Sequence, residues 1–338
     1  MTRGLLLALA GLVLALMTVA ACTTKPTIQG ASLATVQAHI DAATRAAGSD
    51  LKPFLALCKP APATRPKGDD HRLAALIAKP APPPGKAFDN LYFLGDAWVS
   101  AWALDTSDGI ILLDALNNGK EAARLIEGGL RQLGLDPARI KYIVVTHGHG
   151  DHYGGVNYLV GRYRPRVVMS DADWTMTATN LEFRSAYWDA PPHRVKGRDI
   201  AAHDGEAITL DGTTVTLYVT PGHTLGAISP VFDVTWHGVR HRVLEWGGTG
   251  FNFGADFARL DAYIASTDRM QALAQQQKID VLISNHSSFD EAPAKLARLR
   301  AAPDGSNPFV IGTSAVQRAL DVMGECARAQ RDRFAMVK

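Results

Sequence analysis

The sequence has almost no excess charge of either sign. Its 338 residues include 35 lysines and arginines against 33 aspartates and glutamates, which gives a formal net charge of +2 at pH 7. Proteins that bind nucleic acid usually carry a clear basic excess or a basic face, so this balance gives no electrostatic reason to expect a nucleic-acid partner. With 47% hydrophobic residues, the chain can instead bury a sizeable core, which is typical of a globular protein.

Cysteine is scarce, and this argues against a cysteine-based metal site. The sequence has three cysteines, Cys22, Cys58 and Cys326. Neither Cys58 nor Cys326 has a histidine or cysteine neighbour at the spacing of zinc ligands, so we assign no metal to them. In an oxidising compartment they can form a disulfide that ties the N-terminal extension to the C-terminal helix. The alternative is two separate buried thiols.

The longest uninterrupted apolar run stands at the N-terminus. Residues 1–21 place one positive charge, Arg3, before an apolar stretch that ends in small residues. This is the pattern of a secretory signal peptide that is removed on export, although an uncleaved membrane anchor also fits, because about 20 apolar residues cross a bilayer. Val19-Ala20-Ala21-Cys22 resembles the lipobox of bacterial lipoproteins. We therefore expect a periplasmic protein, with membrane attachment through a lipidated Cys22 as one form.

The remaining chain divides into three regions. Residues 22–86 contain a helical stretch at 32–47, with apolar residues at helical spacing, and a proline-rich segment at 59–84. Residues 87–300 alternate short apolar strands and helical stretches, an order typical of a layered α/β domain. Residues 301–338 are expected to form a C-terminal helical extension.

Histidine is concentrated in one short segment, THGHGDHYGG. The segment contains His147, His149, Asp151 and His152, although the whole chain has only 11 histidines. It follows the apolar strand KYIVV, and catalytic groups often occupy the carboxyl ends of strands in α/β folds. His147 and His149 project to the same side of an extended segment, while Asp151 and His152 can turn toward a second point. Imidazole and carboxylate are zinc ligands, so the short spacing indicates two metal ions rather than one.

Two other histidines stand just beyond apolar strands. His223 follows a strand and a Pro-Gly turn in VTPGHTLG, and His286 follows the strand in DVLISNHSSFD. His223 is a good third ligand for His147 and His149. The remaining histidines lie in helical, linker, turn or polar loop contexts, where surface or packing roles are expected.

The pattern HxHxDH, followed by PGHT and a final strand-end histidine, resembles the metallo-β-lactamase superfamily, and the resemblance spans residues 87–299. It implies the four-layer αβ/βα sandwich of that family, with the zinc site at one edge between the two sheets and with helical N- and C-terminal extensions added here. It also implies that two Zn²⁺ ions are bound by two groups of three residues: His147, His149 and His223 for one ion, and Asp151, His152 and His286 for the other.

One position departs from many members of the superfamily. They carry a metal-bridging aspartate in a Gly-Asp pair, whereas this chain has Gly247 and Gly248 at that place in VLEWGGTGFNFG, and Asp233 and Asp256 would be irregular substitutes. The missing carboxylate, the second ligand group and the exported chain resemble subclass B3 metallo-β-lactamases. The resemblance implies hydrolysis of cyclic amides such as β-lactams by a hydroxide shared between two zinc ions, with Asp151 aligning it.

Substrate contacts are expected from the long segment EFRSAYWDAPPHR, residues 182–194, unless it only packs on the surface. Its candidates for an apolar, anionic small-molecule substrate are Tyr187, Trp188 and Arg194. Subclass B3 enzymes often place serines after the strand where this chain has glycines. The candidates to replace those serines are Thr249, Asn252 and Ser288. Further candidates, by proximity to the motif segments, are the aromatic residues Trp98, Tyr153 and Phe251.

Two other functions use the same residues. A zinc hydrolase for lactones, thioesters or other esters needs the same ligands and differs only in its substrate. A non-enzymatic periplasmic zinc-binding lipoprotein would need sites closed by four ligands each, whereas the six candidates leave three per metal.

Overall fold

The computed structural model describes residues 30–65 and 70–336. The expected signal peptide and Cys22 lie outside these residues. No described helix combines the length and the apolar character that a bilayer-crossing segment needs.

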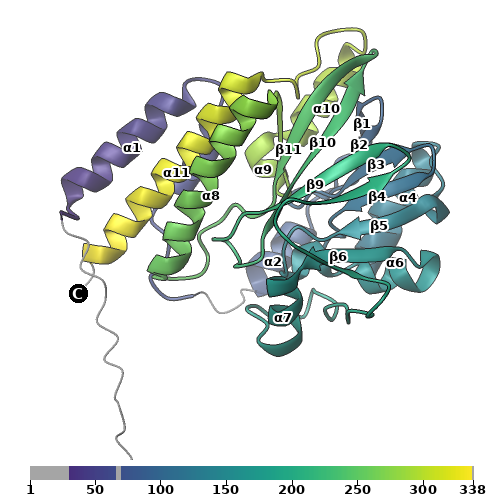
Figure 1. Cartoon of the computed structure of the whole chain (residues 1–338), viewed down its shortest axis with the longest axis horizontal. Coiled ribbons are helices and arrows are strands. Elements are labelled where there is room, and N and C mark those ends of the chain that lie inside the picture. The colour runs from purple at the N-terminus through teal and green to yellow at the C-terminus, as the bar shows by residue number, and fades with distance from the viewer. Residues whose placement is uncertain (1–29, 66–69, 337–338) are drawn as a thin grey trace, which may run out of the picture.

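Two sheets form the centre of the molecule (Figure 1). Neighbours from β1 to β4 are antiparallel and those from β4 to β7 are parallel. The strands of this first sheet are β1 (Gly85–Phe88), β2 (Leu91–Phe93), β3 (Trp102–Thr106), β4 (Gly109–Leu113), β5 (Ile140–Val144), β6 (Arg166–Ser170) and β7 (Ile200–Ala202). The second sheet, in the order β12-β11-β10-β9-β8, consists of β8 (Glu206–Leu210), β9 (Thr213–Val219), β10 (Ile228–Trp236), β11 (Val239–Trp246) and β12 (Val281–Ser284).

The central strands are apolar on both faces, which explains the layers. In β4, Ile111 and Leu113 pack between the two sheets, while Ile110 and Leu112 pack on the other face under helices. In β11, Val243 faces the space between the sheets and Leu244 faces the long helices. A strand that is apolar on both faces must be covered on both, so the result is a four-layer sandwich with helices outside each sheet.

Short helices cover the outer face of the first sheet. These helices are α3 (Gly119–Glu121), α4 (Gly128–Gln132), α6 (Val156–Tyr163) and α7 (Asp171–Thr179). A π-helix at Ala122–Glu127 joins α3 to α4. The remaining short elements are the 3-10 helices η1 (Lys52–Cys58) and η3 (Pro137–Arg139), and the helices α2 (Asp70–Ile77), α5 (Gly150–Tyr153), α9 (Ser287–Asp290) and α10 (Ala292–Ala301).

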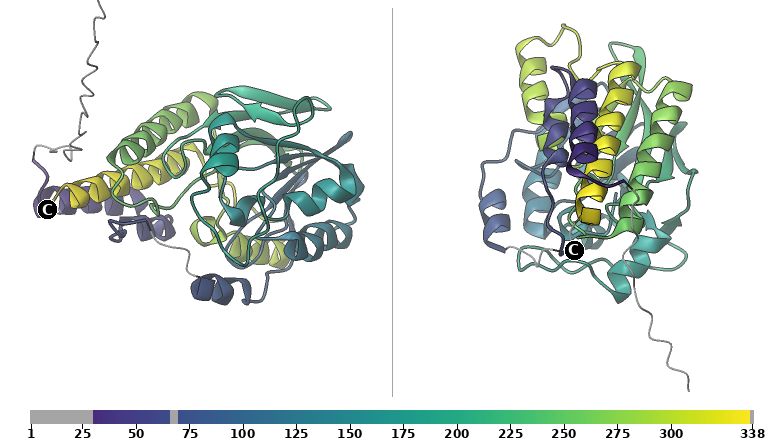
Figure 2. Two further views of the ribbon diagram at one scale, coloured as in Figure 1. Left: turned by 90° about the horizontal axis from the view of Figure 1, so that it is seen from below. Right: turned by 90° about the vertical axis from the view of Figure 1, so that its left-hand side faces the viewer.

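Three long helices cover the outer face of the second sheet. They are α1 (Leu33–Ala47), α8 (Phe257–Gln277) and α11 (Thr313–Met336), and they lie side by side with α11 in the middle (Figures 1 and 2). Ser32 caps α1 by accepting a hydrogen bond from the Thr35 backbone N–H. The N- and C-terminal helices expected from the sequence are therefore parts of one layer rather than separate appendages.

A disulfide between Cys58 and Cys326 joins η1 to α11. This confirms the bonded alternative for the two cysteines. The two cysteines are 268 residues apart in the sequence. The loop that their bond closes therefore contains most of the chain, and the bond restricts the unfolded state over that length. It also anchors η1 near the site, because Phe54 of η1 packs against Phe289 of α9 with ring centroids 5.9 Å apart.

Removal of this disulfide should lower stability. We expect the double variant Cys58→Ala/Cys326→Ala to lose about 2–4 kcal/mol of unfolding free energy, because its unfolded chain gains conformational freedom. Urea unfolding of the oxidised protein and the variant measures this loss. Reductant should destabilise the wild-type protein and leave the variant unchanged, and equal stabilities of the oxidised protein and the variant would contradict the prediction.

Candidate metal centre

The histidine segment lies where several strands end at one edge of the sandwich. His147 follows β5, His223 follows β9 and His286 follows β12. Because β9, β11 and β12 run in the same direction, their carboxyl ends meet at this edge. The Ile228 backbone N–H donates to the Thr146 carbonyl at 2.7 Å and so ties the second sheet to the histidine segment of the first.

The first ligand group consists of His147, His149 and His223. Three ring nitrogens, His147 Nε2, His149 Nδ1 and His223 Nε2, lie 3.1 Å from one another in every pair. A tetrahedral zinc ion with Zn–N bonds near 2.0–2.1 Å requires about 3.3 Å between its nitrogen ligands. The three nitrogens therefore have nearly the spacing of a zinc site.

Hydrogen bonds on the outer nitrogens fix the orientation of two of these rings. His147 Nδ1 donates to the Gly247 carbonyl at 2.7 Å, and His223 Nδ1 donates to the Gly250 carbonyl at 2.6 Å. A carbonyl only accepts, so the proton sits on the outer nitrogen and the inner nitrogen keeps its lone pair. Burial and the neighbouring imidazoles hold the pKa of both His147 and His223 well below the ordinary histidine value, so both rings are neutral and suited to bind a cation.

The second ligand group consists of Asp151, His152 and His286. Asp151 Oδ2 lies 3.5 Å from His152 Nε2 and 3.8 Å from His286 Nε2. Among the described residues, His152 Nε2 is a buried ring nitrogen with no hydrogen-bond partner. Burial opposes ionisation of Asp151, but His152 and His286 hold its pKa well below the usual range. A carboxylate beside an unpartnered imidazole nitrogen suits a divalent cation such as zinc.

Asp114 supports both the second group and the segment before it. This buried residue, at φ +60°, follows β4 and accepts hydrogen bonds from His152 Nδ1 at 2.7 Å, from the Thr146 N–H at 2.7 Å and from Thr146 Oγ1 at 2.8 Å. Asn285 donates to Thr146 Oγ1 at 2.9 Å and to the Gly247 carbonyl at 2.8 Å. Sequence reasoning missed Asp114, although it stands at a strand end like the predicted ligands.

A buried aspartate joins the two loops of the first group. Asp173 in α7 accepts from the Gly148 N–H at 2.8 Å, from Thr224 Oγ1 at 2.7 Å and from the Gly226 N–H at 3.1 Å. Gly148 lies between His147 and His149, and Thr224 follows His223. Asp173 therefore fixes the distance between the two loops, and no sequence motif marked it.

The glycine segment after β11 cannot carry a bridging carboxylate. A Cβ atom on Gly247 would lie 1.7 Å from the Ile228 carbonyl oxygen, and one on Gly248 would lie 2.7 Å from His223 Cβ. Asp233 pairs with Arg240 and Arg242, and Asp256 caps α8 through the Arg259 N–H. Backbone carbonyls of Gly247 and Gly250 instead hold the outer nitrogens of His147 and His223.

Replacement of Gly247 should disturb the first ligand group. We expect Gly247→Ala to weaken zinc binding about 10- to 100-fold, because the added methyl displaces the carbonyl that holds His147. Competition with a chromogenic chelator measures this affinity. Gly161→Ala, at a helical position where no atom of the described residues lies within 4 Å of the added carbon, is the control. Equal zinc affinity of the two variants would contradict the expectation.

A cavity of about 410 Å³ opens over both ligand groups. His149, His223, Asp151 and His286 form part of its floor. Half of its other lining residues are aromatic or aliphatic, and small-molecule sites generally combine such residues with a few polar groups. The apolar wall residues are Leu73, Leu76, Trp98, Phe183, Trp188 and Phe289, and the polar ones are Asp70, Arg72, Ser185, Asn252 and Ser288.

Three of the residues expected to contact substrate, Trp188, Asn252 and Ser288, line this cavity. Trp98, a further candidate, lines it too. Trp188 Nε1 donates to Asn117 Oδ1 at 3.0 Å, and its indole lies over Gly150, where a Cβ would be 2.3 Å from the ring. The segment at 182–194 is therefore a fixed wall of the cavity, and we call it the wall loop.

The other three residues expected to contact substrate are not among those lining the cavity. Tyr187 is 39% exposed. Arg194 pairs with Asp171 at 3.6 Å. Thr249 is buried, and its carbonyl accepts from Tyr263 Oη at 3.1 Å. Tyr153 and Phe251, the two remaining aromatic candidates, are buried packing residues.

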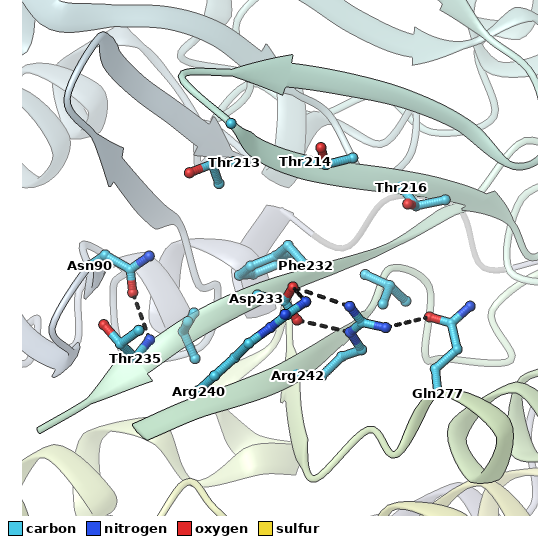
Figure 3. A pocket seen from close by; sticks show the side chains of 13 residues that line it. Asn90, Thr213, Thr214, Thr216, Phe232, Asp233, Thr235, Arg240, Arg242 and Gln277 are labelled. Carbon is cyan, nitrogen blue, oxygen red and sulfur yellow. Dashed lines mark hydrogen bonds and ion pairs between the residues drawn. The ribbon is translucent and has the colours of Figure 1, made fainter. Parts of the chain in front are cut away.

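A second hollow, of about 430 Å³, lies on the second sheet away from the histidines. In Figure 3, Arg240 and Arg242 both converge on Asp233, and Arg242 also faces Gln277. The charged groups of this hollow pair with each other, so it offers less to a ligand than the cavity over the histidines does.

Comparisons with known proteins agree with this geometry. Residues 95–235 match the family model of the metallo-β-lactamase superfamily. The hydroxyacylglutathione hydrolase of Rhodopseudomonas palustris strain BisB5 is 34% identical over 95 residues, which are 27% of this chain and 29% of the relative. The hydroxyacylglutathione hydrolase of Serratia proteamaculans is 33% identical over 129 residues, which are 38% of this chain and 41% of the relative. This chain thus spans less than half the length of these curated relatives.

Solved structures match over much more of the chain. A subclass B3 metallo-β-lactamase of Bradyrhizobium japonicum is 25% identical, with a TM-score of 0.60 over 73% of this chain and 92% of that one. The metallo-β-lactamase of Legionella gormanii is 21% identical, with a TM-score of 0.62 over 71% of this chain and 93% of that one. At this identity the match shows a shared fold. The family match over residues 95–235, the shared fold and the histidine–aspartate site show that this chain belongs to the metallo-β-lactamase superfamily.

Proposed function

We propose that this protein is an exported hydrolase that uses two zinc ions to open cyclic amides of the β-lactam class. The observation that carries the proposal is the pairing of two three-residue ligand groups, without a bridging carboxylate, on the floor of a single aromatic cavity. Three protein ligands per ion leave coordination positions open, as catalytic zinc sites require.

The protein residues would bind and orient the substrate. Two bound zinc ions would supply Lewis acidity and lower the pKa of water toward neutrality. Asp151, whose carboxylate is ionised, can accept a hydrogen bond from the attacking water and keep it in line with the scissile carbonyl. Trp98, Phe183 and Trp188 would hold the apolar part of the substrate and exclude bulk water.

A second candidate is hydrolysis of a thioester or lactone. It is favoured by the curated relatives, which are named hydroxyacylglutathione hydrolases. The β-lactam proposal ranks first because the glycine segment leaves no room for an aspartate at Gly247 or Gly248. The structural match to the subclass B3 enzyme from Bradyrhizobium japonicum, which covers 92% of that chain, supports the same ranking.

Export rests on the N-terminal sequence and is supported by the Cys58–Cys326 disulfide, which fits an oxidising compartment such as the periplasm. Lipid attachment at Cys22 remains part of the proposal. Mass spectrometry of the mature N-terminus tests both: a chain that begins at Cys22 with added lipid supports attachment, and a retained Met1 contradicts cleavage.

A substrate panel tests the proposed activity. The purified protein, loaded with zinc, is assayed in parallel against a chromogenic cephalosporin, a carbapenem, a glutathione thioester and an acyl-homoserine lactone. We expect zinc-dependent opening of the β-lactams and two zinc ions per chain by elemental analysis. Turnover of only the thioester or the lactone would move the protein to the second candidate, and two bound zincs without turnover of any substrate would contradict both.

A further inference from the structure

His149 differs from the other two residues of its group in what holds its outer nitrogen. His147 and His223 donate to backbone carbonyls, whereas His149 Nε2 lies 3.2 Å from Oε2 of Glu182, a side chain in the wall loop. The next residue, Phe183, lines the cavity and meets the His149 ring edge-on, with centroids 4.9 Å apart. Adjacent residues of one loop thus contact both a ligand and the space for the substrate.

Arg259, near the start of α8, holds Glu182 in place. Its Nη1 donates to Glu182 Oε1 at 2.7 Å and its Nε donates to the Gly222 carbonyl, next to His223, at 2.8 Å. The guanidinium carbon lies 4.4 Å from the centre of the Phe253 ring. Arg259 is only 4% exposed, so it cannot swing into solvent. One arginine therefore supports His149 through Glu182 and His223 through its backbone.

The Glu182 carboxylate is only 11% exposed and faces the guanidinium groups of Arg259 and Arg65 as well as the His149 ring. Arg65 Nη2 lies 3.7 Å from Glu182 Oε1 and, like Arg259, can only donate hydrogen bonds. A carboxylate only accepts, so Oε2 of Glu182 requires a donor from His149. That requirement places the proton of His149 on Nε2.

We propose that Glu182, held by Arg259, is a positioning residue that selects the His149 tautomer in which Nδ1 is free to bind metal. This inference rests on the proposed zinc site. Nδ1 is the His149 atom that lies 3.1 Å from both His147 Nε2 and His223 Nε2. The wall loop thereby fixes one ligand of the first group while it shapes the cavity, so a displacement of this wall also disturbs the metal ligand.

The variant Glu182→Gln tests the selection of the tautomer. Glutamine has one acceptor oxygen, which Arg259 takes, and its amide group then donates toward His149 Nε2. That contact favours the proton on Nδ1, the wrong tautomer for binding. We expect the zinc affinity of the first group to fall about 10- to 100-fold, as for other residues that orient metal ligands.

The double variant Glu182→Gln/Arg259→Met makes the test specific. Methionine has no donor, and Arg65, whose Nη2 is 3.7 Å from Glu182 Oε1, is beyond hydrogen-bond distance. The glutamine oxygen is then free to accept from His149 Nε2 and to restore the productive tautomer. We expect this double variant to bind zinc more tightly than Glu182→Gln alone, although it loses one more native contact. A purely structural role of the two residues predicts the opposite order.

Two readouts follow the effect in the purified protein. Competition with a chromogenic chelator gives the zinc affinities, and ¹⁵N chemical shifts of the imidazoles in the metal-free protein report which nitrogen of His149 carries the proton. Glu325→Gln is the matched control, because Glu325 also lies between a histidine and an arginine. It accepts from His39 Nδ1 at 2.7 Å and from Arg328 Nη1 at 3.3 Å, within the layer of long helices. Its zinc affinity should equal that of the wild type.

The outcomes separate this inference from the proposed function. A wild-type protein that binds no zinc overturns the proposed function itself. A wild-type protein that binds zinc, together with an unchanged affinity and an unchanged His149 tautomer in Glu182→Gln, overturns only the inference. A double variant that binds no better than the single variant also overturns it. Weakened binding, the reversed tautomer and partial recovery in the double variant support it.

Discussion

We expect His147→Ala to lower kcat/KM for the preferred substrate by on the order of 10⁴-fold, a loss of about 5.4 kcal/mol of transition-state stabilisation. His147 supplies one of three converging nitrogens, and its Nδ1 also holds the carbonyl of Gly247. Alanine leaves the first group with two ligands and leaves the Gly247 carbonyl with only the hydrogen bond from Asn285. The remaining histidines lie in positions fixed by their own hydrogen bonds and cannot close the gap.

Elemental analysis and steady-state kinetics of His147→Ala measure this effect together. Zinc content should fall from two ions to one or fewer per chain, and chelation of the wild type should reproduce the loss of activity. His241→Ala is the control, since His241 pairs with Asp280 at 2.7 Å in a different part of the second sheet. A variant of His147 that keeps two zincs and activity within tenfold of wild type would show that the first group is not the metal site.

The second large effect is expected at Asp114. Asp114→Asn replaces an acceptor of three hydrogen bonds by an amide that can donate to His152 Nδ1. The proton of His152 then moves to Nε2, the atom that faces Asp151, and the second group loses a ligand. We expect zinc affinity of that group to fall about 10- to 100-fold. Loss of the buried Asp114–His152 ion pair should also lower the free energy of unfolding by about 3–5 kcal/mol.

Asp199→Asn separates the effect on metal from the effect on folding. Asp199 is also buried and accepts from backbone N–H groups, those of Val167 at 3.0 Å and Val195 at 2.8 Å, but it lies away from the ligand groups. We expect this variant to unfold more easily, as Asp114→Asn does, yet to bind zinc as the wild type does. If Asp114→Asn lost stability without losing zinc affinity, Asp114 would have a structural role only.

The grouping of the candidate metal ligands was predictable from sequence because three of them follow strands. A strand end in an α/β sandwich places a side chain at the edge of the sheet, so β5, β9 and β12 bring His147, His223 and His286 together. Within the first motif, alternation along an extended segment pairs His147 with His149. The disulfide could also be proposed from the sequence, because Cys58 and Cys326 were the two cysteines left after the N-terminal one.

The residues that orient those ligands were not predictable in the same way. Glu182 lies 33 positions from His149 and 77 from Arg259, and Asp114 lies 38 from His152. No periodicity or motif links such positions. The wall loop shows the same limit, since Trp188 lines the cavity and its neighbour Tyr187 does not, and a loop has no repeating geometry from which to infer the facing side.

By itself the sequence determined the metal-binding chemistry: imidazole and carboxylate donors, spaced to form two groups, at the ends of apolar strands. Tertiary structure alone decided which ring nitrogen of each candidate ligand histidine carries the proton. It also decided whether Gly247 and Gly248 leave space for a carboxylate, and which side chains enclose the cavity. The physical reason is that donor type and local spacing are properties of short segments. Tautomers, steric exclusion and cavity walls depend instead on groups from distant segments that meet only when the two sheets and their helices pack together.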